Sequence, residues 1–211
     1  MSTPRRALIV IDVQQEYFDG ILQVQYPPRE ESLRNILSAL DVAREHDVPV
    51  VVVQHELTEG APVFAVGSSS WSLHPDIEKW ISEDWKRVAK SHSSVFAGTD
   101  LADWLHEQEV DLITIVGYMT NSCDIATAAA AEGLGFGVEI LSDATGAIHL
   151  ANEAGKVSAQ QLHETLLVLL HSNFAAVGTT QQWAAAVAGG EALTGSDLGS
   201  SAMQGRAVFP A

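Results

Sequence analysis

The 211-residue chain contains a single cysteine, Cys123, and only 11 basic side chains against 27 acidic ones. One cysteine excludes an internal disulfide and any zinc cluster built from several cysteines. The net charge of −16 argues against a nucleic-acid partner, because that affinity comes from clustered Lys and Arg. A single domain of this length buries roughly 70% of its unfolded surface, so a full core forms without disulfides or structural metal.

Long apolar runs are also missing. The first one, 7–11, has five residues and ends at Asp12, which is too short for the apolar region of a signal peptide. No stretch reaches the roughly 18 apolar residues that a membrane span needs. We therefore expect a protein with no membrane partner that is located in the cytoplasm.

Short apolar runs rich in β-branched residues are typical of strands buried on both faces of a parallel sheet. They occupy 7–11, 49–53, 85–89, 111–116, 137–141 and, more weakly, 174–177. Segments of helical composition lie between them, at 30–46, 100–107, 121–132, 153–171 and 180–187. This alternation predicts an α/β fold of three αβα layers, doubly wound around a mainly parallel six-stranded sheet of order 3-2-1-4-5-6.

Residues 1–188 form one predicted domain, and two segments break its rhythm. Segment 57–76 is rich in Gly, Pro and Ser but also contains aromatic residues, which favours a binding loop over a solvated linker. Residues 189–211 form a Gly/Ala/Ser-rich C-terminal tail that we expect to be mobile or docked on a neighbouring subunit. A homodimer or homotetramer is the expected assembly.

Three chemically useful side chains follow strands of the predicted sheet. Asp12 follows the first strand, Lys90 the third and Cys123 the fourth, so all three are expected at the carboxyl edge, where open α/β sheets bind ligands. Taken singly, Asp12 is equally a turn or cap residue, Lys90 a solvated surface lysine and Cys123 an inert core cysteine. Their joint placement favours one site.

The chemistry of a reactive thiol explains these residue types. A thiol reacts as the thiolate, whose formation is favoured at a helix N-terminus beside a cation. Thr120 and Asn121 are good N-cap residues and predict that Cys123 lies in the first helical turn. Lys90 is then the cation, and Asp12 takes the thiol proton and later delivers it to a leaving amine.

Three blocks of the sequence resemble the isochorismatase-like cysteine hydrolases. They are 7–14 (ALIVIDVQ), Lys90 with the following Ser94, Phe96, Gly98 and Thr99, and 117–123 (GYMTNSC). The resemblance continues through 142–144 (SDA) and 162–164 (LHE) and covers about residues 5–187. It implies a catalytic triad of Asp12, Lys90 and Cys123. It also implies a cis peptide bond between Tyr118 and Met119, with the backbone N–H groups of Met119 and Cys123 forming an oxyanion hole.

The sequence departs from parts of the family pattern. Nicotinamidases of this group carry an Asp-x-His pair after the second strand, whereas this chain has Gln54-His55-Glu56, so we expect no metal and no cofactor. His55 and His74 remain candidates for a weak metal site, although isolated histidines are usually hydrogen-bonding or surface residues. Asp124 stands where the family more often has Val, close to the thiol.

The sequence thus predicts a hydrolase that cleaves a small amide or another C–N bond through a thioester. Candidate residues of the substrate pocket, at or near the same strand ends, are Gln14, Phe18, His55, Trp71, Phe96, Tyr118 and Thr120. For the aromatic members, ordinary core packing is the alternative. Because isochorismatases of the siderophore type typically lack the cysteine, Cys123 favours C–N hydrolysis over vinyl ether hydrolysis.

Other classes of function remain open or are disfavoured by the sequence. A catalytically silent scaffold and a thiol redox sensor are further alternatives to the enzyme. A nucleotide-binding domain is disfavoured because neither G-x-G-x-x-G nor G-x-x-x-x-G-K-[ST] occurs in the chain.

Overall fold

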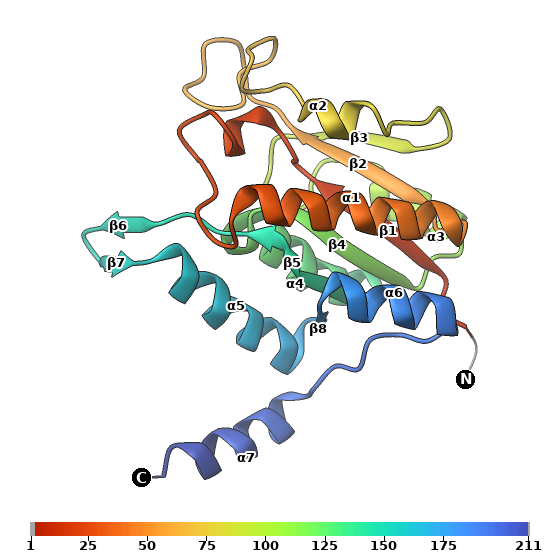
Figure 1. Cartoon of the computed structure of the whole chain (residues 1–211), viewed down its shortest axis with the longest axis vertical. Helices are drawn as coiled ribbons and strands as arrows, with labels where there is room; N and C mark the ends of the chain where they lie inside the picture. Colours follow the sequence, from red (N-terminus) through yellow and green to blue (C-terminus); the bar gives the residue numbers. More distant parts are fainter. Residues whose placement is uncertain (1–2, 211) are drawn as a thin grey trace.

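The computed structural model describes residues 3–210, and its centre is a six-stranded parallel sheet (Figure 1). The strands of the sheet are β1 (Arg6–Ile11), β2 (Val50–His55), β3 (Lys86–Lys90), β4 (Leu112–Tyr118), β5 (Gly137–Gly146) and β8 (Ala176–Gly178). Their order is β3-β2-β1-β4-β5-β8. Because β8 is the sixth strand that the sequence predicted, this confirms the predicted order 3-2-1-4-5-6 and the α/β class.

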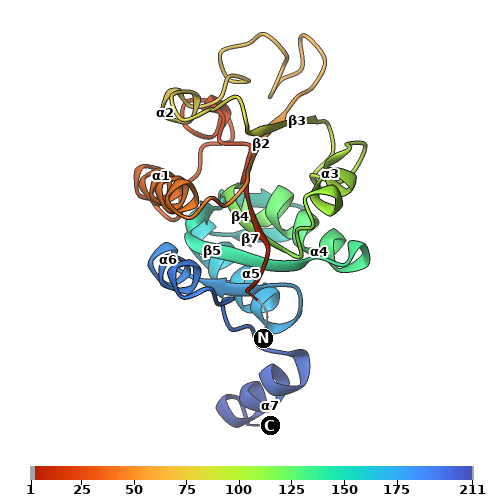
Figure 2. The ribbon, with the colours of Figure 1, turned by 90° about the vertical axis from the view of Figure 1, so that its right-hand side faces the viewer.

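Helices cover both faces of the sheet and make the three layers (Figure 2). The helices are α1 (Arg29–Glu45), α2 (Pro75–Glu78), α3 (Leu101–Glu107), α4 (Ile125–Leu134), α5 (Ala159–Asn173), α6 (Thr180–Gly189) and α7 (Leu198–Val208). One core cluster joins Leu8 and Val10 of β1 to α1 and α6, and the other joins Ile9 and Ile11 to α3, α4 and α5. Alternate residues of β1 therefore enter opposite cores, which explains its continuous apolar run.

The parallel register brings four strand ends to one edge of the sheet. Ile11 pairs with Gly117 of β4, and His55 of β2 pairs with Lys90 of β3. Asp12 follows directly after Ile11, and its backbone N–H donates to Val53 of β2 at 3.0 Å. The ends of β1, β2, β3 and β4 consequently lie side by side, as the sequence predicted for a ligand-binding edge.

A two-stranded hairpin is the main departure from the predicted elements. The strands β6 (Leu150–Asn152) and β7 (Gly155–Val157) pair antiparallel. The sequence predicted a helix over 153–171, so β7 lies where that helix was expected to begin. Helix α5 begins only at Ala159, where the Ser158 hydroxyl accepts a hydrogen bond from the Gln161 N–H. Most hairpin residues are exposed, so they leave no apolar periodicity from which a strand is predicted.

The C-terminal tail contains a helix that composition did not predict. Helix α7 has Ser and Gly at four of its eleven positions, which are weak helix formers. Asp197 caps its N-terminus by accepting a hydrogen bond from the Ser200 N–H at 2.8 Å. The helix extends away from the three layers in both views (Figures 1 and 2). Within residues 3–210, no helix is both long and apolar enough to cross a bilayer.

Candidate active site

Asp12 is held at the end of β1 by unusual backbone geometry on two strands. Its φ of 49° lies in the left-handed region, which a residue with a side chain adopts uncommonly. The neighbouring strand approaches so closely that a Cβ on Gly117 would lie 2.0 Å from the carbonyl oxygen of Ile11. Gly117 is therefore required for β4 to approach the strand that carries Asp12.

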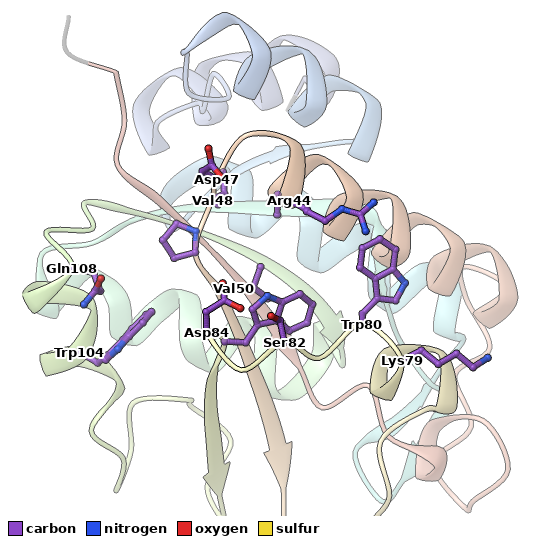
Figure 3. Close-up of a pocket in the computed structure, with 13 residues that line it drawn as sticks. Arg44, Asp47, Val48, Val50, Lys79, Trp80, Ser82, Asp84, Trp104 and Gln108 are labelled. Atoms are coloured by element: carbon purple, nitrogen blue, oxygen red, sulfur yellow. The ribbon is translucent and has the colours of Figure 1, made fainter.

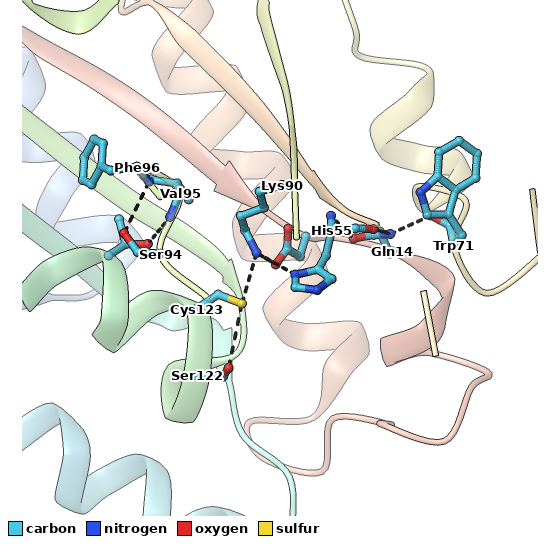
Figure 4. A network of polar contacts seen from close by, with 11 residues as sticks. Gln14, His55, Trp71, Lys90, Ser94, Val95, Phe96, Ser122 and Cys123 are labelled. Carbon is cyan, nitrogen blue, oxygen red and sulfur yellow. Dashed lines mark hydrogen bonds and ion pairs between the residues drawn. The ribbon is translucent and has the colours of Figure 1, made fainter. Parts of the chain in front are cut away.

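Lys90 joins the acid and the thiol (Figure 4). Its Nζ lies 2.6 Å from Asp12 Oδ2 and 3.3 Å from Cys123 Sγ. The side chains of Lys90 and Asp12 are fully excluded from solvent, and Cys123 is 3% exposed. Asp12 Oδ1 has no hydrogen-bond partner among residues 3–210, so this oxygen is available as a proton acceptor. The three side chains that the sequence placed at one edge do lie together.

Cys123 lies in a π-helical turn, Thr120–Asp124, that precedes α4. The predicted side-chain cap is wrong, because Met119 occupies the N-cap position and no side chain caps the turn. Instead, the carbonyl of Met119 accepts the backbone N–H groups of Ser122 and Asp124. The peptide bond between Tyr118 and Met119 is cis, as the family resemblance implied.

Burial and charge determine the protonation of the ion pair. Burial raises the pKa of Asp12 above its usual 3.8, and the attraction of Lys90 only partly offsets this effect. Burial lowers the pKa of Lys90, but the charges of Asp12 and Cys123 outweigh it, so the net pKa is raised. The lysine therefore stays an ammonium cation, and it stabilises negative charge on either neighbour.

The pKa of the Cys123 thiol is raised, although a helix N-terminus beside a cation was expected to favour the thiolate. Burial, followed by the repulsion of Asp12, raises its pKa to about 12, and Lys90 offsets only part of that increase. The difference arises because sequence reasoning counted the helix terminus and the cation but not the complete desolvation of the site. A raised pKa favours the protonated thiol at neutral pH.

His55 completes the polar cluster around Lys90. Its Nδ1 lies 3.0 Å from Lys90 Nζ, and burial followed by the Lys90 charge lowers the pKa of His55 to about 4. His55 is thus neutral, accepts from Lys90 at Nδ1 and carries its proton on Nε2. Asp12, His55 and Cys123 offer ligand atoms within 4.8 Å of one another, a spacing that suits a metal ion. However, the Lys90 ammonium contacts all three and competes for the position that a cation would take.

Asp124 is a second acid beside the nucleophile, and it is completely buried. Neither of its carboxylate oxygens has a hydrogen-bond partner within residues 3–210. Burial, followed by the charge of Asp12, raises the pKa of Asp124 well above 3.8. The same side chain contributes to the raised pKa of Cys123. The sequence identified Asp124 as unusual at this position but did not predict that it lacks partners.

Gln14 connects the strand ends to the 57–76 loop. Its amide nitrogen donates to the backbone carbonyls of His55 at 2.9 Å and Trp71 at 2.7 Å, and its Oε1 accepts the His55 N–H. Both amide hydrogens are therefore used, one on the end of β2 and the other on the loop. Trp71 is half-buried, and its indole N–H has no partner within residues 3–210. The loop is attached to the strand ends through the Trp71 carbonyl, whereas the Trp71 ring points away from Cys123 (Figure 4).

The remaining pocket candidates have partners that sequence reasoning could not identify. The Tyr118 hydroxyl pairs with Ser32 at 2.7 Å, and the Thr120 hydroxyl pairs with His163 at 2.9 Å. Phe96 stacks on Phe136 with ring centroids 5.8 Å apart, which is the core-packing alternative. Phe18 is buried against His74, with ring centroids 4.4 Å apart. Nδ1 of His74, the other candidate for a weak metal site, accepts the Asp76 N–H.

His163 is a supporting residue whose role the sequence did not reveal. It is 2% exposed, and its Nε2 lies 3.0 Å from the carbonyl of Ser142 while its Nδ1 faces Thr120. If Nε2–H donates to the carbonyl, Nδ1 accepts from the Thr120 hydroxyl. His163 thereby ties the turn that carries Cys123 to α5. Its only sequence signal was the 162–164 block of the resemblance.

A separate cavity of about 560 Å³ opens at the opposite end of the sheet (Figure 3). Its wall includes Trp80, Trp85 and Trp104, and the guanidinium of Arg44 lies 4.5 Å from the Trp80 ring. The cavity contains none of the triad residues, and its position near Val50 puts it at the amino end of β2. This cavity therefore lies away from the carboxyl edge of the sheet, where Asp12, Lys90 and Cys123 lie together.

Comparison with known proteins agrees with this geometry. The family model of the isochorismatase domain matches residues 6–182 of this sequence. The chain belongs to the isochorismatase family. It is similar to the crystal structure of an isochorismatase-type protein from Burkholderia xenovorans LB400, with 46% identity, a TM-score of 0.95, and coverage of 98% of this chain and 99% of that one. An isochorismatase from Pseudomonas putida KT2440 is 27% identical with a TM-score of 0.79, covering 86% and 91% of the two chains.

Two enzymes with named substrates are among the more distant relatives of this isochorismatase-family chain. Nicotinamidase 3 of Arabidopsis thaliana is 27% identical over 80% of this chain and 82% of its own length. Streptothricin hydrolase of Streptomyces noursei is 33% identical over 67% of this chain and 54% of its own length. The chain is therefore a hydrolase of the isochorismatase family in which Asp12, Lys90 and Cys123 lie together as a candidate triad.

Proposed function

We propose that this protein is a cysteine-dependent hydrolase of a small amide or another C–N bond, working through a thioester. The observation that carries the proposal is the buried contact of one ammonium, Lys90, with both the Asp12 carboxylate and the Cys123 sulfur. The similarity to a nicotinamidase, whose name denotes amide hydrolysis, supports the bond type. In this protein the substrate is a small-molecule amide, and no metal or cofactor takes part in any step.

The first half of the reaction forms the thioester. Asp12 Oδ1, which lacks a partner, takes the Cys123 proton as Sγ attacks the carbonyl carbon of the amide. The carbonyl π electrons move to the oxygen and form a tetrahedral oxyanion. As the oxyanion collapses, the C–N bond breaks and Asp12 delivers its proton to the leaving amine. The raised pKa of Asp12 suits it to this exchange of a proton.

The second half releases the acid. Water attacks the thioester carbonyl and gives its proton to Asp12, and the C–S bond breaks. The departing sulfur recovers the proton from Asp12, so the enzyme returns to its resting protonation. Lys90 stabilises the negative charge that moves between carboxylate and sulfur. The backbone N–H groups of Met119 and Cys123 are the proposed donors to the oxyanion.

The substrate contacts are proposed around the half-buried side of the cluster. His55 is partly exposed, and no other residue described here accepts its Nε2–H. Such a donor favours an acceptor-bearing substrate. Phe64 packs against His55 with ring centroids 4.9 Å apart and provides an apolar wall. A compact, planar amide fits this combination.

A substrate screen with a matched variant tests the proposal. The purified protein is incubated with nicotinamide, carbamoyl compounds, maleamate, biuret and lactams, and released ammonia or amine is measured. At least one amide should be turned over, and C123A and C123S should each lower that rate by about 10³-fold or more. Turnover that survives in C123A would overturn the covalent route. Cleavage of isochorismate by C123A would instead identify a vinyl ether hydrolase.

A further inference from the structure

The cavity at the amino end of β2 gathers three of the five tryptophans of the chain (Figure 3). Trp80 and Trp85 come from the connection between α2 and β3, and Trp104 comes from α3. All three residues are half-buried, so each leaves part of a large aromatic side chain at the cavity wall. The volume of about 560 Å³ lies within the range of small-ligand pockets, which are typically lined by aromatic and apolar side chains.

One of these three indole rings already engages a cation. The guanidinium carbon of Arg44 lies 4.5 Å from the centroid of the Trp80 ring. Among aromatic side chains an indole attracts a cation most strongly, because its ring face carries the negative part of the quadrupole. Within residues 3–210, no Lys or Arg is stacked on Trp85 or Trp104. These two rings therefore lack the cationic partner that Trp80 has.

The charge that is left unpaired at this cavity is negative. Its two basic side chains, Arg44 and Lys79, each form an ion pair of 2.7 Å with the aspartate three residues before them. By contrast, Asp47 and Asp84 also line the cavity, are exposed and have no cationic partner within residues 3–210. The net charge of −16 on the whole chain adds a field that attracts cations. The cavity is therefore suited to a positively charged ligand.

Asp84 combines this negative charge with the aromatic wall. Figure 3 shows it between Trp80 and Trp104, and Trp85 follows it directly in the chain. A metal ion such as Ca²⁺ takes six or more oxygen ligands, which this wall of indoles does not offer. An alkylated ammonium ion uses both features, because its methyl groups contact the rings while its charge attracts the carboxylate. The wall thus favours an organic cation.

We propose that this cavity binds a small solute that carries a trimethylammonium group. The methyl groups contact the indoles of Trp85 and Trp104, and the positive charge faces Asp84. None of the large apolar side chains that are exposed in 3–210 lines the cavity, so a membrane that displays the same group finds no apolar anchor there. The site contains no triad residue and is independent of the proposed reaction.

A charged ligand and its uncharged analogue test the chemical class. Choline is compared with the alcohol in which a tert-butyl group replaces the trimethylammonium group, so that shape is kept and charge is lost. Each is titrated into the full chain by calorimetry. Choline should bind saturably at one site, and the alcohol should bind at least about tenfold more weakly, because it lacks the cation–π and carboxylate attraction. Equal affinity for both, or no saturable choline binding at millimolar concentrations, overturns the proposal.

Two neighbouring substitutions locate the site. Asp84→Asn removes the carboxylate at the cavity, and Glu83→Gln removes the same charge from an exposed residue that does not line it. D84N should weaken choline binding by about fivefold or more, whereas E83Q should change it by less than about twofold. Trp104→Leu, checked for folding by circular dichroism, should weaken it about fivefold as well. One dissociation constant shared by the wild type, D84N and E83Q overturns the proposal, because the cation then binds elsewhere.

Phosphatidylcholine vesicles present the same trimethylammonium group on a lipid. We expect the protein not to sediment with them, because the rim of the cavity has no apolar anchor. Vesicle binding that E83Q keeps and D84N loses would assign the cavity to a membrane surface and overturn its assignment to a solute.

Discussion

Lys90 Nζ lies 2.6 Å from Asp12 Oδ2, and both side chains are completely excluded from solvent. Such a pair has lost the hydration of both charges, so each partner depends on the other. The same ammonium lies 3.3 Å from Cys123 Sγ. The Lys90 contacts on which the proposed reaction depends therefore also affect the stability of the fold. The two roles can be measured separately.

Removal of one partner should destabilise the fold strongly. Lys90→Met leaves the Asp12 carboxylate buried without a cation, and we expect a loss of about 3–5 kcal/mol in the free energy of unfolding. The double variant D12N/K90M should recover much of that loss because it leaves no buried charge. Urea unfolding of the two single variants and the double variant measures the coupling. Losses that simply add up would contradict a mutually dependent pair.

Alkylation of Cys123 should report a protonated resting thiol. Because Cys123 is the only cysteine, intact mass after iodoacetamide treatment follows this one group. With a pKa raised to about 12, the thiolate fraction increases with pH across the whole range from neutral to strongly alkaline. The rate at pH 7 should be slower than that of a free cysteine. A rate that levels off below pH 8 would show an activated thiolate instead.

The Asp124 side chain should lower the free energy of unfolding at neutral pH. Its folded-state pKa is raised above 3.8, so the stabilising contribution of its protonated form is complete below that value and is lost as the pH rises through the raised pKa. Asp124→Val should therefore gain about 1–3 kcal/mol at pH 7 and progressively less towards pH 4. Chemical unfolding at several pH values measures this, with D124N as the variant that keeps the shape. A pH-independent difference between D124V and wild type would contradict the assignment.

Gly117 should tolerate no side chain. A Cβ there would lie 2.0 Å from the Ile11 carbonyl oxygen, and φ is 108°, so Gly117→Ala should lose about 3 kcal/mol or more. Gly133 of α4 has no atom within 4 Å of its hypothetical Cβ. Gly133→Ala is the matched control and should gain about 0.5–1 kcal/mol from helix propensity. Equal thermal stability of the two variants would disprove the close approach of β4 to β1.

The sheet and the triad could be predicted from the sequence because they depend on local patterns. Continuous β-branched runs indicate buried parallel strands, and the polar residue that ends each run then falls at the carboxyl edge. This reasoning placed Asp12, Lys90 and Cys123 together from three separate stretches of the chain. Desolvation is a property of the folded whole, which is why the sequence did not decide the direction in which the pKa of Cys123 shifts.

The surroundings of the triad were less predictable because their partners are distant in sequence. Tyr118 depends on Ser32, Thr120 on His163 and Phe96 on Phe136, and no local pattern links these pairs. The hairpin of β6 and β7 and the helix α7 are mostly exposed, so they lack the apolar periodicity on which the prediction of an element rests.

A thioester on Cys123 is the central claim, and trapping the acyl group tests it most directly. An amide that is turned over is mixed with excess enzyme, quenched in acid during the first turnover and analysed by intact mass and peptide mapping. We predict a mass gain equal to the acyl part of the substrate, located on Cys123, and diversion to a hydroxamate when hydroxylamine is added. A stoichiometric burst of released amine with no added mass on Cys123, or unchanged turnover in C123A, would contradict the account.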